Sequence, residues 1–592
     1  MNCDQDITGV ECNAIVTVKE SELLQCFRKE CEEGMGVYLN SKKPFQLFFN
    51  EAAGTYFIDK SLMLQDLIPL AANSEDILAQ EEKGQGKDNR YVCITRPRRF
   101  GKTLMASMIA SFFSKGSDSR KVFQKLKIGA AEKFENHINK HNVIYITFNE
   151  IPNECTTYTQ YISRIKKNLI YDLKSAFPDI WMEPEDAIWD VLNRIYETRE
   201  DATFIFVLDE WDYIFHRDFV NDKDKGDYLD FLSNLLKGQP YVEFAYMTGI
   251  LPIQKYSSGS ELNMFCEYTM VTEEKYAEYF GFTEKEVDEL YERYQKQLKE
   301  VSKVTRAGLR IWYNGYHTKA GERVYNPRSV VFALMNNNLG NYWTNSGPYD
   351  EIFYYIEKNI ADVRDDLALL VSGTPVSAKV REYAATSMNL TTKNEIFSAM
   401  VVYGFLNYED GYVSIPNKEL MDKFADMIAK EPSLGYVHRF AKESARMLQA
   451  TKAGDTKTML EILEYTHNTE SPLLSYSNEA ELTAVISLVY LEARDTYRIE
   501  REDKAGIGYV DFIFYPYRKD DDCIILELKV DHTALEAIRQ IKDRKYALKF
   551  HGKLGEKPQY TGRVLAVGIA YDKESKKHSC KIEVLEYLSQ LL

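Results

Sequence analysis

The sequence predicts a multidomain α/β protein, in which two regions of mixed helices and strands flank a mainly helical middle. Its 592 residues exceed what one hydrophobic core usually organises. Near the C-terminus, residues 477–572 show the pattern helix, β-hairpin, helix and strand. In the N-terminal half, four short apolar runs have the composition of buried strands in one parallel sheet: 91–95, 142–149, 204–208 and 242–249.

Composition and charge restrict the class of protein. Hydrophobic residues make up 45% of the chain, and no apolar run approaches the roughly eighteen residues that span a membrane. The N-terminus lacks a basic stretch followed by an apolar one, so we expect a cytoplasmic protein without a membrane partner. Nine scattered cysteines form no CxxC pair, which favours reduced thiols. The formal net charge is −16, so the protein can contact nucleic acid only through a local basic patch. The basic stretch 539–553 is either such a patch or a solvated helix face.

The sequence RPRRFGKT at 96–103 has the features of a phosphate-binding loop. It follows a strand-like run and precedes a segment with apolar residues at helical spacing. In such a loop, backbone N–H groups and the helix N-terminus surround the phosphates, a lysine neutralises their charge, and a hydroxyl binds Mg²⁺. Gly101, Lys102 and Thr103 supply the end of this pattern. Arg96 stands where such loops usually begin with glycine.

A second element of a nucleotide site follows the strand-like run 204–208. Asp209 and Glu210 come directly after it, at the strand end where a carboxylate can hold the Mg²⁺ of a nucleotide. Glu210 would then polarise the water that attacks the γ-phosphate. The alternative is a strand that merely ends in two surface acids. Thr248, near the end of 242–249, is either a γ-phosphate sensor or an ordinary hydrogen-bonding residue at a strand end.

Together these motifs resemble the predicted AAA-ATPase-like family of bacterial P-loop ATPases. The resemblance implies binding and hydrolysis of ATP with Mg²⁺, and it implies that arginine at position 96 is a normal form of the loop. Arg98 and Arg99 either contact phosphate or pair with surface acids, and a homo-oligomer is left open. The similar segments are TYFIDKS at 55–61, YVCITRPRRFGKT at 91–103, FIFVLDEWD at 204–212, AYMTGILPI at 245–253 and FGFTEKEV at 280–287.

The middle of the chain is predicted to be mainly helical. Residues 273–301 are rich in helix formers of alternating charge and predict a solvated lid or bundle. Residues 392–420 predict a helix followed by a hairpin with an Asp410-Gly411 turn, the outline of a winged-helix unit that binds DNA or another protein domain. Arg328 either completes a neighbouring nucleotide site as an arginine finger or forms a structural salt bridge.

Three charged residues interrupt the apolar strands of the hairpin predicted at 508–530. Asp511 lies within the first strand, while Glu527 and Lys529 are two residues apart on the second and therefore project from one face. Burying such charges without partners is costly, so they either face solvent at a sheet edge or form a site. Asp511, Glu527 and the Leu528 carbonyl could hold a divalent cation. Lys529 would then position water and offset the charge of a scissile phosphate.

This arrangement, D-x15-E-L-K, resembles the PD-(D/E)XK nuclease superfamily. Helices at 477–493 and 534–547 and a strand at 563–572 match the order of that superfamily's core. The resemblance implies a restriction-endonuclease-like α/β domain that uses Mg²⁺ and acts on DNA or RNA. It also implies that Glu479, near the start of the first helix, adds a carboxylate to the metal shell. A domain that keeps this fold but has lost cleavage is the alternative.

These predictions divide the chain into five parts. We expect an ATPase whose nucleotide state controls a Mg²⁺-dependent nuclease acting on DNA or RNA. The competing interpretation is a nucleotide-driven switch that binds nucleic acid or a protein without cutting. The parts are an N-terminal extension (1–40), a P-loop ATPase domain (41–270), a helical lid and connector (271–390), a winged-helix-like and helical connector (391–470) and a nuclease-like domain (471–592).

Overall fold

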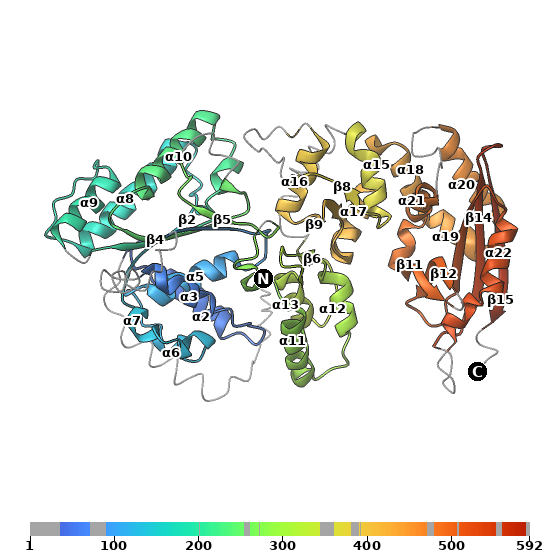
Figure 1. Cartoon of the computed structure of the whole chain (residues 1–592), viewed down its shortest axis with the longest axis horizontal. Coiled ribbons are helices and arrows are strands. Elements are labelled where there is room, and N and C mark those ends of the chain that lie inside the picture. The colour runs from blue at the N-terminus through green and yellow to red at the C-terminus, as the bar shows by residue number, and fades with distance from the viewer. Residues whose placement is uncertain are drawn as a thin grey trace, which may run out of the picture. The chain divides into compact units, whose positions relative to one another are not determined.

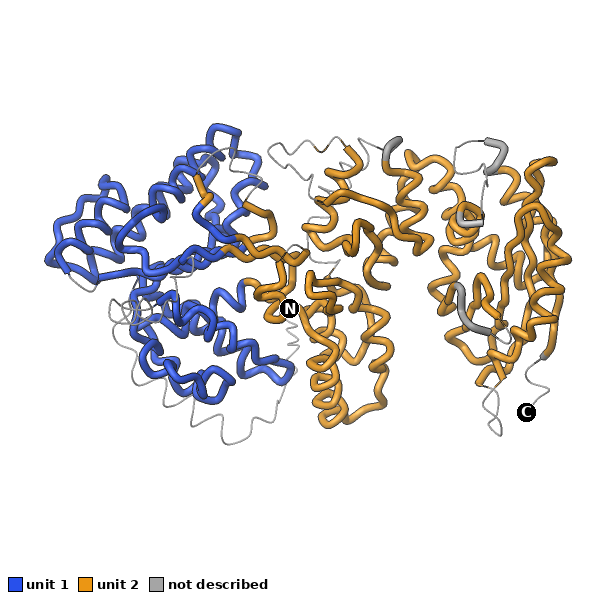
Figure 2. Tube along the Cα trace, viewed as in Figure 1, with its two compact units in different colours: residues 1–92, 103–248, 264–266 blue, residues 93–102, 249–263, 267–592 orange. Residues whose placement is uncertain are grey.

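The structure is a computed structural model, shown in Figure 1 with its helices and strands labelled. The Cα trace divides into two compact units, coloured in Figure 2: residues 1–92, 103–248 and 264–266, and residues 93–102, 249–263 and 267–592. None of the described helices is long and apolar enough to cross a membrane. The described residues are 36–71, 90–199, 202–253, 261–271, 273–343, 360–380, 390, 392–469, 479–505, 508–551 and 559–587.

A five-stranded sheet contains the four strands that the apolar runs predict. Its order is β2-β3-β4-β1-β5, and β3 runs parallel to both β2 and β4. The first four strands are almost entirely buried, as expected for parallel strands covered on both faces. The short β5 is only half-buried and has no apolar run, so its sequence gave no strand signal. The bounds are β2 (Asn142–Thr147), β3 (Phe204–Asp209), β4 (Val242–Gly249), β1 (Tyr91–Thr95) and β5 (Cys266–Tyr268).

Helices cover both faces of this sheet. Their bounds are α2 (Lys43–Ala52), α3 (Met63–Leu67), α5 (Lys102–Phe113), α8 (Tyr158–Ala176), α9 (Ile188–Thr198) and α10 (Asp222–Leu236). Figure 1 shows α8, α9 and α10 on one face and α2, α3 and α5 on the other. In α9, Ile188, Val191, Leu192 and Ile195 recur at helical spacing and are all buried. With both faces covered, the sheet exposes polar groups mainly at its strand ends.

The end of the predicted N-terminal extension is attached to this sheet. Residues 1–35 lie outside the described residues, but Leu39 forms a bridge with Ile144 of β2. The carboxylate of Asp172 on α8 accepts hydrogen bonds from the backbone N–H groups of Val37, Tyr38 and Leu39 at 3.0, 2.6 and 3.1 Å. Residues 37–39 therefore belong structurally with the sheet.

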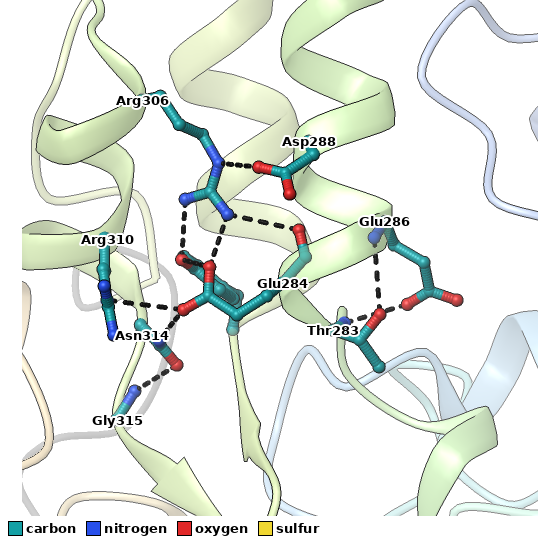
Figure 3. A network of polar contacts seen from close by, with 9 residues as sticks. Thr283, Glu284, Glu286, Asp288, Arg306, Arg310, Asn314 and Gly315 are labelled. Carbon is teal, nitrogen blue, oxygen red and sulfur yellow. Dashed lines mark hydrogen bonds and ion pairs between the residues drawn. The ribbon is translucent and has the colours of Figure 1, made fainter.

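A polar network joins the first two of the three helices that follow β5. The helices are α11 (Glu284–Gln297), α12 (Arg306–Tyr313) and α13 (Pro327–Met335). Figure 3 shows the Arg306 guanidinium between the carboxylates of Asp288 and Glu284, with a distance of 2.6 Å from Nε to Asp288 Oδ1. Asn314 donates a further hydrogen bond of 2.9 Å to Glu284 Oε1. These contacts tie the start of α11 to α12, so the helical segment predicted at 273–301 is packed rather than isolated.

The helix and hairpin predicted at 392–420 are present. They are α16 (Lys393–Tyr403), β9 (Asn407–Glu409) and β10 (Tyr412–Ser414), and β10 also pairs with β8 (Val376–Ser377). Asp410 and Gly411 form the turn with positive φ angles of 48° and 88°. Much of α16 is buried, and the exposed turn carries acidic side chains. A buried helix beside an acidic turn favours protein packing over contact with a nucleic-acid backbone.

The phosphate-binding loop packs against this winged-helix-like element. Gly404 ends α16 with φ 85°, and a Cβ placed there would lie 2.6 Å from Pro97 Cβ. The Phe100 ring meets the Tyr316 ring edge-on, with 5.1 Å between ring centroids. Tyr316 in turn donates a hydrogen bond of 3.0 Å to the Gly404 carbonyl. The loop and the end of α16 are therefore in direct contact.

Helices lead from this element to a second sheet, whose order is β11-β12-β13-β14-β15. β13 and β14 are parallel and are joined through α22, while the other neighbours are antiparallel. The predicted order of helix, hairpin, helix and strand is thus confirmed. The bounds are α15 (Ile360–Val371), α17 (Lys418–Lys430), α18 (Tyr436–Lys442), α19 (Ser444–Ala453), α20 (Thr456–Thr469), α21 (Glu479–Val489), β11 (Tyr497–Ala505), β12 (Gly508–Pro516), β13 (Cys523–Val530), α22 (Ala534–Asp543), β14 (Arg563–Asp572) and β15 (Lys577–Tyr587).

Alternate residues of β13 enter two separate hydrophobic cores. Leu526 and Leu528 pack into the core shared with α21, whereas Ile525 packs with residues of α22 such as Ile538 and Ile541. Because side chains alternate along a strand, Glu527 and Lys529 lie on the same face of β13 as Ile525. This face is the one that faces α22. The charged residues of the hairpin therefore lie beside α22.

Candidate nucleotide and metal sites

The loop before α5 is curled around the side chain of Lys102. The Lys102 ammonium donates hydrogen bonds to the carbonyls of Arg96 and Pro97, both at 3.0 Å, and the residue is buried. Arg99 and Gly101 have positive φ angles of 70° and 89°, which turn the chain sharply before the helix. This geometry is that of a loop whose backbone bends around a lysine at a helix N-terminus, which suits an anionic ligand.

Arg96, at the position usually held by glycine, is a buried anchor of the loop. It is only 1% exposed, and its Nη1 donates hydrogen bonds to the carbonyls of Thr95 and Tyr268 at 2.8 and 2.7 Å. Its guanidinium lies 4.9 Å from the centroid of the Phe280 ring. Its own N–H donates to the Gly249 carbonyl at 3.2 Å. Arg96 therefore fixes the peptide whose carbonyl receives Lys102.

We expect Arg96→Gly to weaken ATP binding even though it restores the usual loop sequence. Glycine adds backbone freedom and removes the contacts with Tyr268 and Phe280, so the carbonyl that holds Lys102 is no longer fixed. The KM for ATP should rise about tenfold, with a smaller change in kcat. Steady-state phosphate release measures both constants. Arg96→Lys should recover part of the loss, and an unchanged KM in Arg96→Gly would contradict this role.

The other residues predicted around the loop differ in exposure. Arg98 is half-buried, while Arg99 and Thr103 are exposed. Thr103 lies in the first turn of α5, directly after Lys102. Arg328 stacks on Phe332 of its own helix, 4.5 Å from the ring centroid, and forms no ion pair with any described residue. The salt bridge expected for Arg328 is thus absent from the described part of the chain.

Three polar residues lie side by side at the carboxyl ends of parallel strands. Asp209 of β3 pairs in register with Thr147 of β2 and with Thr248 of β4. Asp209 and Thr248 are fully buried, and the negative charge of Asp209 adds to burial in raising the pKa of Tyr145. Glu210 follows with a positive φ of 56°, a strained conformation for this residue. The structure thus brings Asp209 and Thr248 together and places Glu210 at the same strand end.

Asp511 and Glu527 lie on neighbouring strands of the C-terminal sheet. The antiparallel register pairs Phe512 with Leu526, and its continuation by one residue places Asp511 opposite Glu527. Asp511 Oδ2 accepts a hydrogen bond of 2.6 Å from the backbone N–H of Leu528. Lys529 Nζ lies 3.0 Å from Glu527 Oε1. The three residues predicted from the D-x15-E-L-K pattern therefore form one cluster.

Burial changes the acidity of Glu527. Its side chain is 3% exposed, and burial together with the charge of Asp511 raises the pKa of Glu527 to about 7, despite the opposing effect of Lys529. Its Oε2 atom is buried without a hydrogen-bond partner among the described residues. A buried carboxylate oxygen without a donor, next to a second carboxylate, fits a divalent cation that needs oxygen ligands.

The described residues contain no cluster of three or more His, Cys, Asp or Glu side chains around this point. Two carboxylates suit Mg²⁺, which usually keeps several waters and takes further oxygen ligands from substrate phosphates. Glu479, the predicted third carboxylate, is the first residue of α21, but its side chain lies outside the described part of the structure. The donor set therefore fits Mg²⁺ through Asp511 and Glu527.

The raised pKa of Glu527 predicts a pH-dependent stability of the metal-free protein. Between pH 4.5 and about 7, this carboxyl stays protonated when folded but ionises when unfolded, so its contribution to stability falls as the pH rises. Glu527→Gln mimics the protonated form and removes this effect. In EDTA, we expect the variant to gain stability over the wild type between pH 5 and pH 8, by up to about 3 kcal/mol. Urea unfolding at the two pH values measures it, and a pH-independent difference would contradict the expectation.

Gln540 and Tyr546 join the cluster from α22 and the turn after it. The Gln540 side-chain amide donates a hydrogen bond to Glu527 Oε1 and lies 3.5 Å from the Tyr546 hydroxyl. Tyr546 donates to the Tyr509 carbonyl at 2.5 Å. The sequence places Gln540 on the helix after the hairpin, but its contact with Glu527 is visible only in three dimensions. Gln540 orients the buried carboxylate from the helix side.

Comparison with known proteins identifies two regions of the chain. Residues 85–258 match the family described as predicted AAA-ATPase, and residues 477–579 match the PD-(D/E)XK nuclease superfamily. An uncharacterised protein from the vnfD 5′ region of Azotobacter chroococcum mcd 1 is 23% identical over 258 residues, which are 43% of this chain and 47% of that protein. The match therefore spans about half the length of this curated relative.

Two solved structures align with long stretches of the chain at low similarity. A Walker-type ATPase of Pyrococcus abyssi aligns at 13% identity and a TM-score of 0.31, covering 60% of this chain and 99% of that one. The ORC2 protein of Aeropyrum pernix aligns at 10% identity and a TM-score of 0.28, covering 61% and 94%. At these TM-scores, the fold assignment rests on the strand order and the two matched regions. The chain therefore joins a region that matches the predicted AAA-ATPase family to a C-terminal region that matches the PD-(D/E)XK nuclease superfamily.

Proposed function

We propose that this protein is a cytoplasmic ATPase whose nucleotide state controls Mg²⁺-dependent cleavage of DNA or RNA by its C-terminal domain. The observation that carries the nuclease half is the cluster of Asp511, Glu527 and Lys529, with Glu527 buried and its Oε2 atom free of hydrogen bonds to described residues. The ATPase half is supported by the loop curled around Lys102 at the start of α5.

The polar residues of the nucleotide motifs have distinct functions in the proposed binding and hydrolysis of ATP. Lys102 neutralises the phosphate oxygens, with Gly101 allowing the backbone to approach them. Thr103 and Asp209 would hold Mg²⁺, and Glu210 would polarise the attacking water. Thr248, Arg98 and Arg99 contact the γ-phosphate region in this proposal; the half-buried and exposed positions of the two arginines leave them accessible to a ligand.

For cleavage, Asp511 and Glu527 would hold Mg²⁺ and Lys529 would act beside them. Bound Mg²⁺ would stabilise the charge that develops on the scissile phosphate. The Lys529 ammonium lies 3.0 Å from Glu527 Oε1, and in this proposal it orients a water and faces the same phosphate. Gln540 holds the Glu527 carboxylate in position. Hydrolysis then adds the water oxygen to phosphorus and breaks one P–O ester bond.

Control by the nucleotide is supported by the contact between the loop and the middle of the chain. Pro97 meets Gly404 and Phe100 meets Tyr316, so a change of the loop bears directly on the end of α16. The helices after α16 lead on to the nuclease-like sheet within the same compact unit.

Cleavage assays on plasmid DNA and structured RNA test this proposal. The full chain is incubated with Mg²⁺ or Mn²⁺, with and without ATP, and compared with the chain in EDTA. We expect metal-dependent cleavage whose rate changes with ATP. ATP hydrolysis without cleavage under any of these conditions would favour the nucleotide-driven switch. Cleavage at the same rate with and without ATP would refute control of the nuclease by the nucleotide. Light scattering during the same experiments reports whether copies of the chain associate.

A further inference from the structure

A surface cavity of about 460 Å³, open to solvent, lies next to the proposed metal site. It is formed by the start of β12, by α22 and by the turn that follows α22, and Gln540 is part of its wall. The same Gln540 amide donates to Glu527 Oε1. A cavity of this size lies in the range that binds small ligands or single building blocks of a polymer. It therefore adjoins the proposed cleavage site through a shared side chain.

The wall of the cavity carries an exposed cation and an exposed aromatic ring. Arg539 is exposed and makes no hydrogen bond or ion pair with any described residue. Tyr509 is 67% exposed, and no described ring or cation packs on it. Arg544 adds a second guanidinium to the wall. Phosphate groups bind guanidinium groups, and nucleobases stack on tyrosine rings.

Charge balance argues against the backbone of a double helix as the ligand. Glu536 and Asp543 line the cavity together with the two arginines, so the lining has no net charge. Binding to duplex DNA without base contacts depends on many uncompensated cations. A small cavity with a ring, an amide and both signs of charge instead suits a whole nucleotide, whose base offers donors and acceptors and whose phosphate is anionic. In a duplex that base is stacked and paired, and is therefore unavailable.

We propose that this cavity binds one unpaired nucleotide of a single-stranded nucleic acid, next to the phosphate that is cleaved. The base stacks on Tyr509 and the phosphate pairs with Arg539. The inference rests on the proposed nuclease function and specifies its substrate as single-stranded. The cavity chemistry is common to DNA and RNA, so the experiment includes both.

Binding without cleavage separates this inference from the nuclease activity. In EDTA, fluorescence anisotropy of the full chain measures its affinity for a labelled single-stranded DNA, a single-stranded RNA and a DNA duplex of equal length. We expect a single strand to bind at least tenfold more tightly than the duplex. Tyr509→Ala and Arg539→Ala should each weaken single-strand binding about tenfold. The two single strands show which sugar the cavity accepts.

Lys542→Ala is the matched control. Lys542 lies on the same helix and loses the same charge, but it pairs with Glu583 away from the cavity wall. Equal binding of single strand and duplex, or equal losses in Arg539→Ala and Lys542→Ala, would overturn the inference. Single-strand binding that needs Tyr509 and Arg539, in a chain that never cleaves with Mg²⁺, would refute only the nuclease function.

Discussion

Replacing Lys102 with alanine is expected to abolish ATP turnover, with a loss of about 100-fold or more in kcat/KM. The Lys102 ammonium is the cation around which the loop is curled, bound by the carbonyls of Arg96 and Pro97. We expect ATP phosphates to draw it from these carbonyls, because an anion is a stronger partner than two neutral acceptors. Phosphate release and binding of a fluorescent ATP analogue measure the loss.

The control must show that the Lys102→Ala chain remains folded. Lys121→Ala removes the same charge from an exposed position on the short helix Arg120–Phe123, and it should leave turnover unchanged. Thermal unfolding of both variants should resemble that of the wild type. Turnover that survives in a folded Lys102→Ala protein would remove the nucleotide site from this loop.

Replacing Glu527 with alanine is expected to abolish metal-dependent cleavage, again by about 100-fold or more. Glu527 is the more buried of the two carboxylates of the cluster, and its removal leaves Asp511 to bind the metal alone. It also leaves Lys529 and Gln540 without their common acceptor. Nuclease assays and Mn²⁺ binding by calorimetry should both show the loss.

Two further variants define the cause of this loss. Glu527→Gln keeps the volume and a hydrogen-bond acceptor but removes the charge, so it should lose cleavage as fully as alanine while keeping the fold. Glu574→Ala removes an exposed carboxylate from the turn between β14 and β15 and should cleave normally. Normal cleavage by Glu527→Gln would show that Glu527 has a packing role and does not bind metal.

The sequence predicted best what depends on local pattern. The runs at 91–95 and 204–208 are strands because continuous apolar stretches between turns can be buried on both faces. Strands β11 and β15 were not predicted, since charged residues occur along the edge strands of a sheet and hide the apolar alternation. Their pairing with the hairpin, which completes the five-stranded sheet, depends on contacts distant in sequence.

For the site residues too, the sequence predicted what depends on local pattern and missed contacts between residues distant in sequence. Asp511, Glu527 and Lys529 were found because strand alternation fixes which side chains share a face. The contact of Gln540 with Glu527 depends on how α22 crosses the sheet, which no local pattern states. The buried position of Arg96 depends likewise on Tyr268 and Phe280, more than 170 residues further along the chain. From the sequence alone, Arg96 was noted only because it stands where such loops usually begin with glycine.

The contact between Pro97 and Gly404 offers a route by which ATP binding at the loop and ligand binding at the C-terminal domain would affect each other. A Cβ at Gly404 would lie 2.6 Å from Pro97 Cβ, so a displacement of the loop toward α16 would press directly on the end of that helix. Consider a second ligand whose binding shifts α16. Thermodynamic linkage requires that this ligand changes the affinity for ATP by the same factor by which ATP changes the affinity for the ligand. Occupancy of the C-terminal domain by its substrate would, on this basis, be readable as a change in the dissociation constant of ATP.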